Sequence, residues 1–448
     1  MRLLNQKPLA ELIASTVKLL REPAGPTYRT REAILNDREE FTKCFHRGLY
    51  AIHACAIDGI MTVESKLKRL TMPKESQLAE KRVRQIFRTL NDSIVWTLLA
   101  KDPDFWVARL SRGKPRGNLA DQNPASVLTF LNRVSASGEK IGIWNDATRC
   151  VDLGDVTIFD RAEGIQFLEL KQGKVNEAIF ETVKTSTVAA IDKFYESFAK
   201  KGIEQLDRTV NQEIQAQKHE LLLKNENLTD PFTGLDRIAI TPSIPASSYD
   251  DELRDSLVRV RSSETVTLTI DECLHLVIIN AERCNRAKGQ PLVNEYFSRM
   301  VAKPKDDEAN PCRAVMGFLY GFSLPTSMPV FLRPFHAEDI SRLCMGDVQI
   351  YYCFDFNTWG KKLKTVQFKW TSQKEGRQER SKPFENRLLL IDDRIPYIVN
   401  TNGEPIYFGG QFFLKLLFQG LRPDYLAAVY DESPANLALE RPDKKQHS

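Results

Sequence analysis

The sequence lacks long apolar runs, and this absence excludes a protein that spans a membrane with helices. No stretch approaches the ~18 consecutive apolar residues that a membrane helix needs. Residues 1–7 also lack the apolar core of a secretory signal. We therefore expect a cytoplasmic protein with no membrane partner.

Paired cysteines are also missing. The eight cysteines are scattered without a CxxC pair, which excludes a disulfide scaffold and indicates reduced, buried thiols. One group superficially resembles a zinc set: Cys44, His46, His53 and Cys55. All four lie in one expected helix, where side chains follow each other at about 100°, so Cys44 and His46 point about 200° apart. The four side chains therefore cannot converge on one tetrahedral ion.

The chain has no strong excess of charge of either sign. Its 63 basic and 59 acidic residues leave a net charge of +4, so no field over the whole molecule attracts nucleic acid. Any site for a polyanion must come from local clustering. The phosphate loop of NTPases, the GxSxG elbow and the HExxH motif are absent as well, so NTP hydrolysis, serine-hydrolase and zinc-protease functions lack their usual signals.

What is present is the composition of a folded protein, with 42% hydrophobic and 27% charged residues. At roughly 100–200 residues per domain, 448 residues suggest two or three domains. Residues 226–250 are rich in Pro, Ser and Thr, a composition typical of a linker. We expect an N-terminal helical region at 1–74, an α/β core at 75–225, the linker at 226–250 and a C-terminal α+β domain at 251–448.

Apolar spacing predicts the elements of these regions. Helical periodicity covers 31–69, 77–99 and, farther on, 271–286. Short runs rich in β-branched and aromatic residues predict strands at 141–144, 155–159, 165–171, 349–356, 365–370 and 388–391. The Asn402-Gly403 pair predicts a further hairpin. A polar helix with a narrow apolar stripe is expected at 203–221; it packs within its domain or forms a homodimer surface.

The chemistry is concentrated in one predicted hairpin. The turn at 160–164 joins the strand that begins at Asp155 to the strand that carries Glu169, Leu170 and Lys171. Side chains alternate along a strand, so Glu169 and Lys171 share a face, and hairpin pairing brings Asp155 to them. Two convergent carboxylates suit Mg²⁺ or Mn²⁺.

The residue types gathered in this hairpin suggest the hydrolysis of phosphodiester bonds. We expect the carboxylates of Asp155 and Glu169 and the carbonyl of Leu170 to hold the metal, which polarises the phosphodiester. Lys171 would orient or deprotonate the attacking water, or offset charge in the transition state. Gln172 would bind water or phosphate.

This segment resembles the PD-(D/E)xK nucleases, the superfamily of restriction enzymes and many repair nucleases. The resemblance covers about residues 75–200: a helix, an early strand, the Asp155 strand, the Glu-Leu-Lys strand and a following helix. It implies a restriction-endonuclease-like fold, in which helices flank a mixed sheet. Gly154 stands where the motif has Pro. The superfamily often adds a polar residue from the preceding helix; Asp92 is the candidate, and a solvated helix position is its alternative.

The resemblance implies a metal-dependent nuclease that cuts nucleic acid, with DNA favoured over RNA because the superfamily mostly cuts DNA. By analogy we expect a bacterial defence or restriction endonuclease whose C-terminal domain senses an activating protein partner, binds nucleic acid or assembles the complex. The alternative from another class is a non-catalytic module of the same fold that binds nucleic acid or protein. In that case Asp155, Glu169 and Lys171 are structural charges; an exposed ion pair on an edge strand is the other explanation of the Glu-x-Lys pattern.

Two basic stretches are candidates for contact with a nucleic-acid backbone. The first is a Gly- and Pro-containing loop with Arg112, Lys114 and Arg116. The second combines Lys361, Lys362 and Lys364 with Trp359 and Trp370, a mixture suited to phosphate contact with base stacking. A solvated hairpin with core aromatics explains the second stretch equally well.

Overall fold

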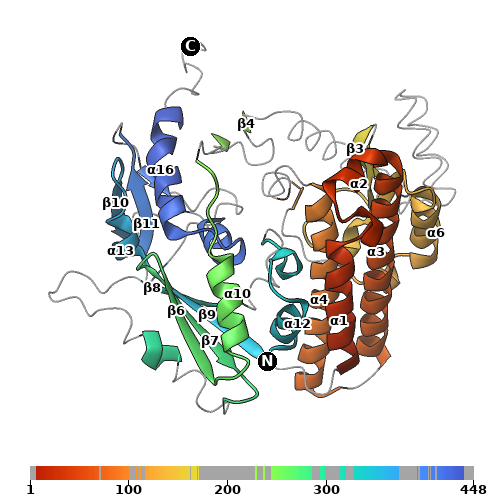
Figure 1. Ribbon diagram of the computed structural model, residues 1–448, viewed down its shortest axis with the longest axis horizontal. Coiled ribbons are helices and arrows are strands. Elements are labelled where there is room, and N and C mark those ends of the chain that lie inside the picture. Colours follow the sequence, from red (N-terminus) through yellow and green to blue (C-terminus); the bar gives the residue numbers. More distant parts are fainter. Residues whose placement is uncertain are drawn as a thin grey trace, which may run out of the picture. The chain divides into compact units, whose positions relative to one another are not determined.

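The structure, a computed structural model, combines helices with small antiparallel sheets, so the chain is α/β overall (Figure 1). It describes residues 7–69, 72–99, 107, 110–111, 117–161, 163–168, 170, 228–229, 236–237, 244–284, 293–297, 313–318, 327–372, 391, 394–401, 403, 405–408 and 411–437. Contacts group the chain into two compact units. Unit 1 comprises 1–21, 66–96 and 238–448, and unit 2 comprises 22–65 and 97–237. The sequential domain boundaries expected above remain predictions.

The helices of unit 2 follow the expected apolar periodicity. They are η1 (Pro26–Tyr28), α2 (Arg31–Asn36), α3 (Arg38–Arg69, whose last residues belong to unit 1), η2 (Leu119–Asp121) and α6 (Pro124–Ser135). The helix expected over 31–69 is broken at Asp37, which has a non-helical backbone. The carboxylate of Asp37 accepts the N–H of Glu40 at 3.3 Å and so caps the start of α3.

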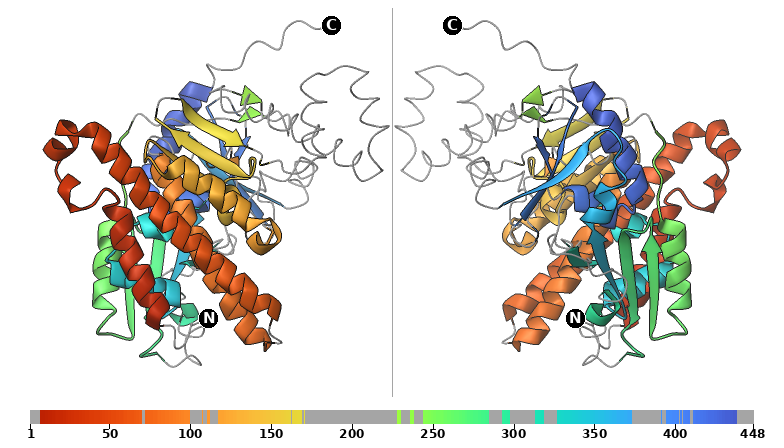
Figure 2. Two further views of the ribbon diagram at one scale, coloured as in Figure 1. Left: turned by 90° about the vertical axis from the view of Figure 1, so that its right-hand side faces the viewer. Right: turned by 90° about the vertical axis from the view of Figure 1, so that its left-hand side faces the viewer.

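The larger described sheet of unit 2 is an antiparallel meander of β1 (Lys140–Trp144), β2 (Val156–Asp160) and β3 (Gly164–Leu168), with η3 (Asn145–Ala147) after β1. Asp160 pairs with Gly164, which confirms the predicted hairpin turn. In Figure 2 the helix α6 lies against the strands. The approach is close at Gly142 of β1, where a Cβ would lie 2.8 Å from Leu131 of α6. A short ladder joins β4 (Leu228–Thr229) to β5 (Asp236–Arg237).

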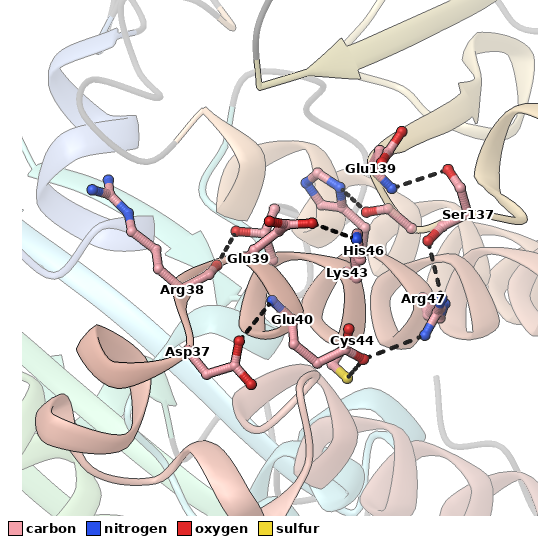
Figure 3. A network of polar contacts seen from close by, with 12 residues as sticks. Asp37, Arg38, Glu39, Glu40, Lys43, Cys44, His46, Arg47, Ser137 and Glu139 are labelled. Carbon is pink, nitrogen blue, oxygen red and sulfur yellow. Dashed lines mark hydrogen bonds and ion pairs between the residues drawn. The ribbon is translucent and has the colours of Figure 1, made fainter.

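Two histidines of α3 attach that helix to the sheet. His46 donates from Nδ1 to the carbonyl of Gly138 at 2.8 Å, and Nε2 of His53 accepts the N–H of Trp144 at 2.9 Å. Figure 3 shows His46 within a group of polar contacts, to side chains and to backbone groups, among residues from Asp37 to Glu139. Burial lowers the pKa of His46, since it disfavours the charged ring. Both histidines therefore have structural roles, as hydrogen-bond partners of β1 and the turn before it.

Three helices of unit 1 come from distant parts of the sequence. They are α1 (Lys7–Arg21), α4 (Lys74–Leu98) and α12 (Ala337–Met345). Ser341 of α12 donates to the carbonyl of Ala10 at 3.0 Å, and Arg82 of α4 donates to the carbonyl of Cys344 at 2.8 Å. The N-terminal helix α1 therefore packs with an element more than three hundred residues away.

The larger sheet of unit 1 has the order β6-β7-β9-β8, formed by β6 (Thr265–Ile270), β7 (Leu274–Asn280), β9 (Val348–Asp355) and β8 (Arg313–Gly317). The helix α10 (Asp250–Arg259) lies along it (Figure 1). The helix predicted at 271–286 is wrong. Asp271 and Glu272 have positive φ and turn the chain, and every residue of β7 is buried. A short, wholly apolar run fits a central strand as well as a helix. Here the run forms a strand because β6 pairs with one of its edges and β9 with the other.

A second sheet of unit 1 joins β10 (Gln367–Ser372), β11 (Arg394–Val399) and β12 (Pro405–Tyr407). It confirms the hairpin expected at Asn402-Gly403 and the strand at 365–370, as β9 confirms the strand at 349–356. Of the strand expected at 388–391, Ile391 forms a bridge to Arg394, and the rest lies outside the described residues. The accompanying helices are η5 (Val330–Leu332), α13 (Phe356–Gly360), α15 (Gln411–Phe413), the π-helix η8 (Leu414–Phe418) and α16 (Pro423–Leu437).

In unit 1, a buried arginine that forms an ion pair also donates a hydrogen bond to a backbone carbonyl of the π-helix η8. Arg333, fully buried, binds Asp250 at 2.7 Å through Nε and donates from Nη1 to the carbonyl of Phe418 at 2.8 Å. A buried guanidinium needs this compensation because desolvation of an unpaired charge is costly. Over the described part of the chain, no helix is long and apolar enough to cross a membrane.

Candidate active site

Asp155 lies at the end of the β1–β2–β3 meander, one residue before β2. Its backbone N–H donates to the carbonyl of Leu168 at 2.8 Å, and its carbonyl accepts the N–H of Asn145 at 2.9 Å. Asp155 is therefore held by both neighbouring strands. A residue at such a position has little freedom to move, because its own peptide groups belong to the ladder.

The side chain of Asp155 reaches the middle of the Glu-Leu-Lys segment. Its Oδ2 accepts the N–H of Leu170 at 2.7 Å, a charge-assisted hydrogen bond across fifteen positions of sequence. The hairpin thus brings Asp155 to the segment that the sequence singled out. Glu169, Lys171 and Gln172 lie outside the described residues, so their convergence with Asp155 remains a prediction.

Gly154 explains why a proline does not precede the aspartate. Its φ is +63°, a conformation closed to proline, whose ring fixes φ near about −65°. A Cβ at this position would lie 2.8 Å from the carbonyl oxygen of Leu168. That oxygen accepts the N–H of Asp155, so the glycine permits the close approach of the two strands.

Asn145 is a residue of the site that the sequence reasoning missed. It is fully buried, and its side chain binds the carbonyls of Leu153 and Gly154 and the hydroxyl of Thr157. In the sequence, Asn145 could have been noticed as a polar residue directly after an apolar strand that pairs with the strand of Asp155. Such a position is a common place for functional side chains, but the pattern alone does not distinguish it from a turn residue.

The structure describes all three lysines of the second basic stretch. Lys361 and Lys364 are exposed. Lys362 forms ion pairs with Asp424 at 3.0 Å and Glu272 at 3.8 Å. Lys361 and Lys364 therefore remain candidates for phosphate contact, whereas the ammonium of Lys362 is already engaged by two carboxylates.

The tryptophans of this stretch belong to an aromatic core. Trp359 is fully buried, and its indole N–H donates to the carbonyl of Pro423 at 3.0 Å. Trp370 is half-buried, donates to Asn357 at 2.9 Å and packs edge-on against Phe368. Trp359 therefore cannot stack on a base, and the alternative of core aromatics holds for it.

Other candidates have different outcomes. The described residues do not include Arg112, Lys114, Arg116 or the helix expected at 203–221. Asp92 is fully buried in α4, so its interpretation as a solvated helix residue is wrong. Desolvating a carboxylate is costly, so its burial requires compensating polar contacts.

The donor set available for a metal begins with one carboxylate. Asp155 offers hard oxygens, the ligands that Mg²⁺ and Mn²⁺ prefer. No cluster of three or more His, Cys, Asp or Glu side chains able to hold a metal occurs among the described residues. Glu169, the second carboxylate of the expected site, lies outside these residues.

We compared the chain with protein-family models, with curated proteins and with solved structures. None of these comparisons gives a match.

Proposed function

We propose that this protein is a metal-dependent nuclease of the PD-(D/E)xK type that hydrolyses phosphodiester bonds, in DNA rather than RNA. The observation that carries the proposal is the hydrogen bond from Leu170 to the carboxylate of Asp155. It joins an aspartate directly before one strand of a hairpin to Leu170, the central residue of the Glu-x-Lys segment that follows the other strand in the sequence. This is the local arrangement on which the resemblance to the nuclease superfamily rests.

The order of elements supports the same proposal. The described α6, β1, β2 and β3 follow one another as helix, strand, strand and strand; Asp155 directly precedes β2, and the Glu-Leu-Lys segment directly follows β3 in the sequence. We therefore propose a restriction-endonuclease-like fold for unit 2. The substrate preference and the bacterial defence or restriction role rest on analogy with the superfamily.

In the proposed mechanism Asp155, Glu169 and the carbonyl of Leu170 would hold Mg²⁺ or Mn²⁺. When bound, the metal supplies Lewis-acid polarisation of the scissile phosphate. Lys171 orients the attacking water and offsets the charge that develops on the phosphate oxygens. Gln172 holds that water or a phosphate oxygen by hydrogen bonding. Lys361 and Lys364, in unit 1, contact the backbone of the nucleic acid.

The test compares isosteric variants that keep the fold. Asp155→Asn and Glu169→Gln should abolish cleavage, since they remove charged metal ligands, and Lys171→Met should keep metal binding while it loses the chemical step. Asp155→Asn retains an oxygen that can accept the N–H of Leu170. Glu163→Gln is a matched control, because Glu163 is an exposed acid of the same hairpin, 3.5 Å from Lys140. Circular dichroism verifies the fold of every variant.

The assay offers single- and double-stranded DNA and RNA with Mg²⁺ or Mn²⁺, and a chelator should stop any cleavage. If the wild type cuts a substrate and the Asp155 and Glu169 variants cut it equally well, the proposed site is wrong. If metal binds and nucleic acid binds but no substrate is cut under any condition, the non-catalytic binding module becomes the better description.

A further inference from the structure

Every polar atom of the Asn145 side chain is used to hold the segment around Asp155. The amide Nδ2 donates to the carbonyls of Leu153 and, at 3.2 Å, Gly154. The oxygen Oδ1 accepts the hydroxyl of Thr157 at 2.8 Å. These bonds go to residues on both sides of Asp155: Leu153 and Gly154 lie two and one positions before it, and Thr157 lies two positions after it.

The geometry of the meander places these groups on one face. The β1–β2 ladder pairs Trp144 with Val156, and the bond from the N–H of Asn145 to the carbonyl of Asp155 extends it by one position. Residues opposite each other in an antiparallel pair share a face, as do residues two apart on a strand. Asn145, Asp155 and Thr157 therefore project from the same face of the sheet.

Only an asparagine-like amide meets the demands of this position. It must donate to two carbonyl oxygens and accept from a hydroxyl at the same time, all in a site where both Asn145 and Thr157 are fully buried. An aspartate would place a charged oxygen against the carbonyls of Leu153 and Gly154. An apolar residue would leave these groups buried without a partner, which is costly.

We propose that Asn145 is a positioning residue for the carboxylate of Asp155 and thereby sets the affinity of the site for its divalent metal. The inference rests on the proposed nuclease function and deepens it. Asn145 fixes the backbone on either side of Asp155, while the N–H of Leu170 fixes the carboxylate itself. Metal sites need their ligands held within about 0.5 Å of the productive geometry, and residues behind the ligands supply this constraint.

The experiment measures Mn²⁺ binding to the full chain by titration calorimetry, beside cleavage as a function of Mn²⁺ concentration. Thr157→Val removes the hydroxyl that Asn145 accepts, with little change of shape, and Asn145→Asp replaces the donor. Both should weaken Mn²⁺ binding about 10-fold or more, the usual effect of losing a group behind a metal ligand. Cleavage at saturating Mn²⁺ should be largely retained in Thr157→Val, which separates positioning from catalysis.

Two variants serve as controls. Thr157→Ser keeps the hydroxyl and should bind Mn²⁺ as the wild type does. Ser135→Ala removes another buried hydrogen bond to β1, the one that Ser135 accepts from the N–H of Gly142 at 3.1 Å. It should lower thermal stability without changing Mn²⁺ affinity, because Gly142 lies on β1 away from its Asp155 end.

The outcomes distinguish the two proposals. If Asp155→Asn abolishes Mn²⁺ binding but Thr157→Val binds Mn²⁺ like the wild type, Asn145 has a structural role only and the inference is overturned while the proposed function stands. If the wild type binds no Mn²⁺, or Asp155→Asn binds it equally well, both are overturned. Should Asn145→Asp fail to fold, Thr157→Val and Thr157→Ser still decide the question.

Discussion

Replacing Gly154 by alanine is a direct test of the local geometry that places Asp155. The change imposes two costs on the folded state. A side chain at φ +63° costs about 1–2 kcal/mol, because Cβ meets the neighbouring carbonyl in the left-handed region. The new Cβ would also lie 2.8 Å from the carbonyl oxygen of Leu168, and relieving such overpacking costs about 1–3 kcal/mol.

Gly164 is the matched control in the same hairpin. Its φ is +82°, so alanine meets a similar backbone cost there, but nothing lies within 4 Å of a Cβ built on it. Both substitutions also restrict the unfolded chain to the same extent. We expect Gly154→Ala to lower the free energy of unfolding by about 2–5 kcal/mol and Gly164→Ala by about 1–2 kcal/mol.

The measurement is equilibrium urea denaturation of both variants and the wild type, followed by circular dichroism. If the two substitutions cost the same, the close approach of Gly154 to Leu168 does not exist as described. If Gly154→Ala costs nothing, the left-handed backbone is wrong as well. Under the proposed function Gly154→Ala should also reduce cleavage, because the carbonyl that it displaces accepts the N–H of Asp155.

Two further predictions concern His46 and the exposed lysines. Burial lowers the pKa of His46 below the value of about 6.5 in the unfolded chain, so the unfolded state binds more protons and stability falls as pH drops below about 6.5. His46→Asn keeps a donor for Gly138 and should flatten this fall in urea denaturation near pH 5 relative to pH 7.5; an unchanged slope would contradict the assignment. Replacing Lys361 and Lys364 together by alanine should weaken DNA binding and reduce the slope of log affinity against log salt by about 1.8. Fluorescence anisotropy across a salt series measures this slope. Lys362→Ala is the control and should have a smaller effect. If the affinity of the double variant for DNA is unchanged, the proposal that Lys361 and Lys364 contact the nucleic-acid backbone is wrong.

The sequence by itself determined the features that depend on neighbours along the chain. Alternating apolar residues and the Asp160–Gly164 turn predicted the β2–β3 hairpin, and the structure confirms it. The register of that hairpin follows from its turn, so the sequence also predicted that Asp155 meets the Glu-Leu-Lys segment. Helical periodicity likewise predicted α3 and α4, although it did not reveal the break at Asp37.

Tertiary structure decided the rest, because contacts between distant residues leave no local pattern. The run at Leu276–Ile279 is a strand, since β6 and β9 pair with both of its edges. The helix α1 belongs with α12, which provides the hydroxyl that binds the carbonyl of Ala10. Asn145 became a candidate only when folding placed its amide against the residues around Asp155, where a buried polar group must find its partners.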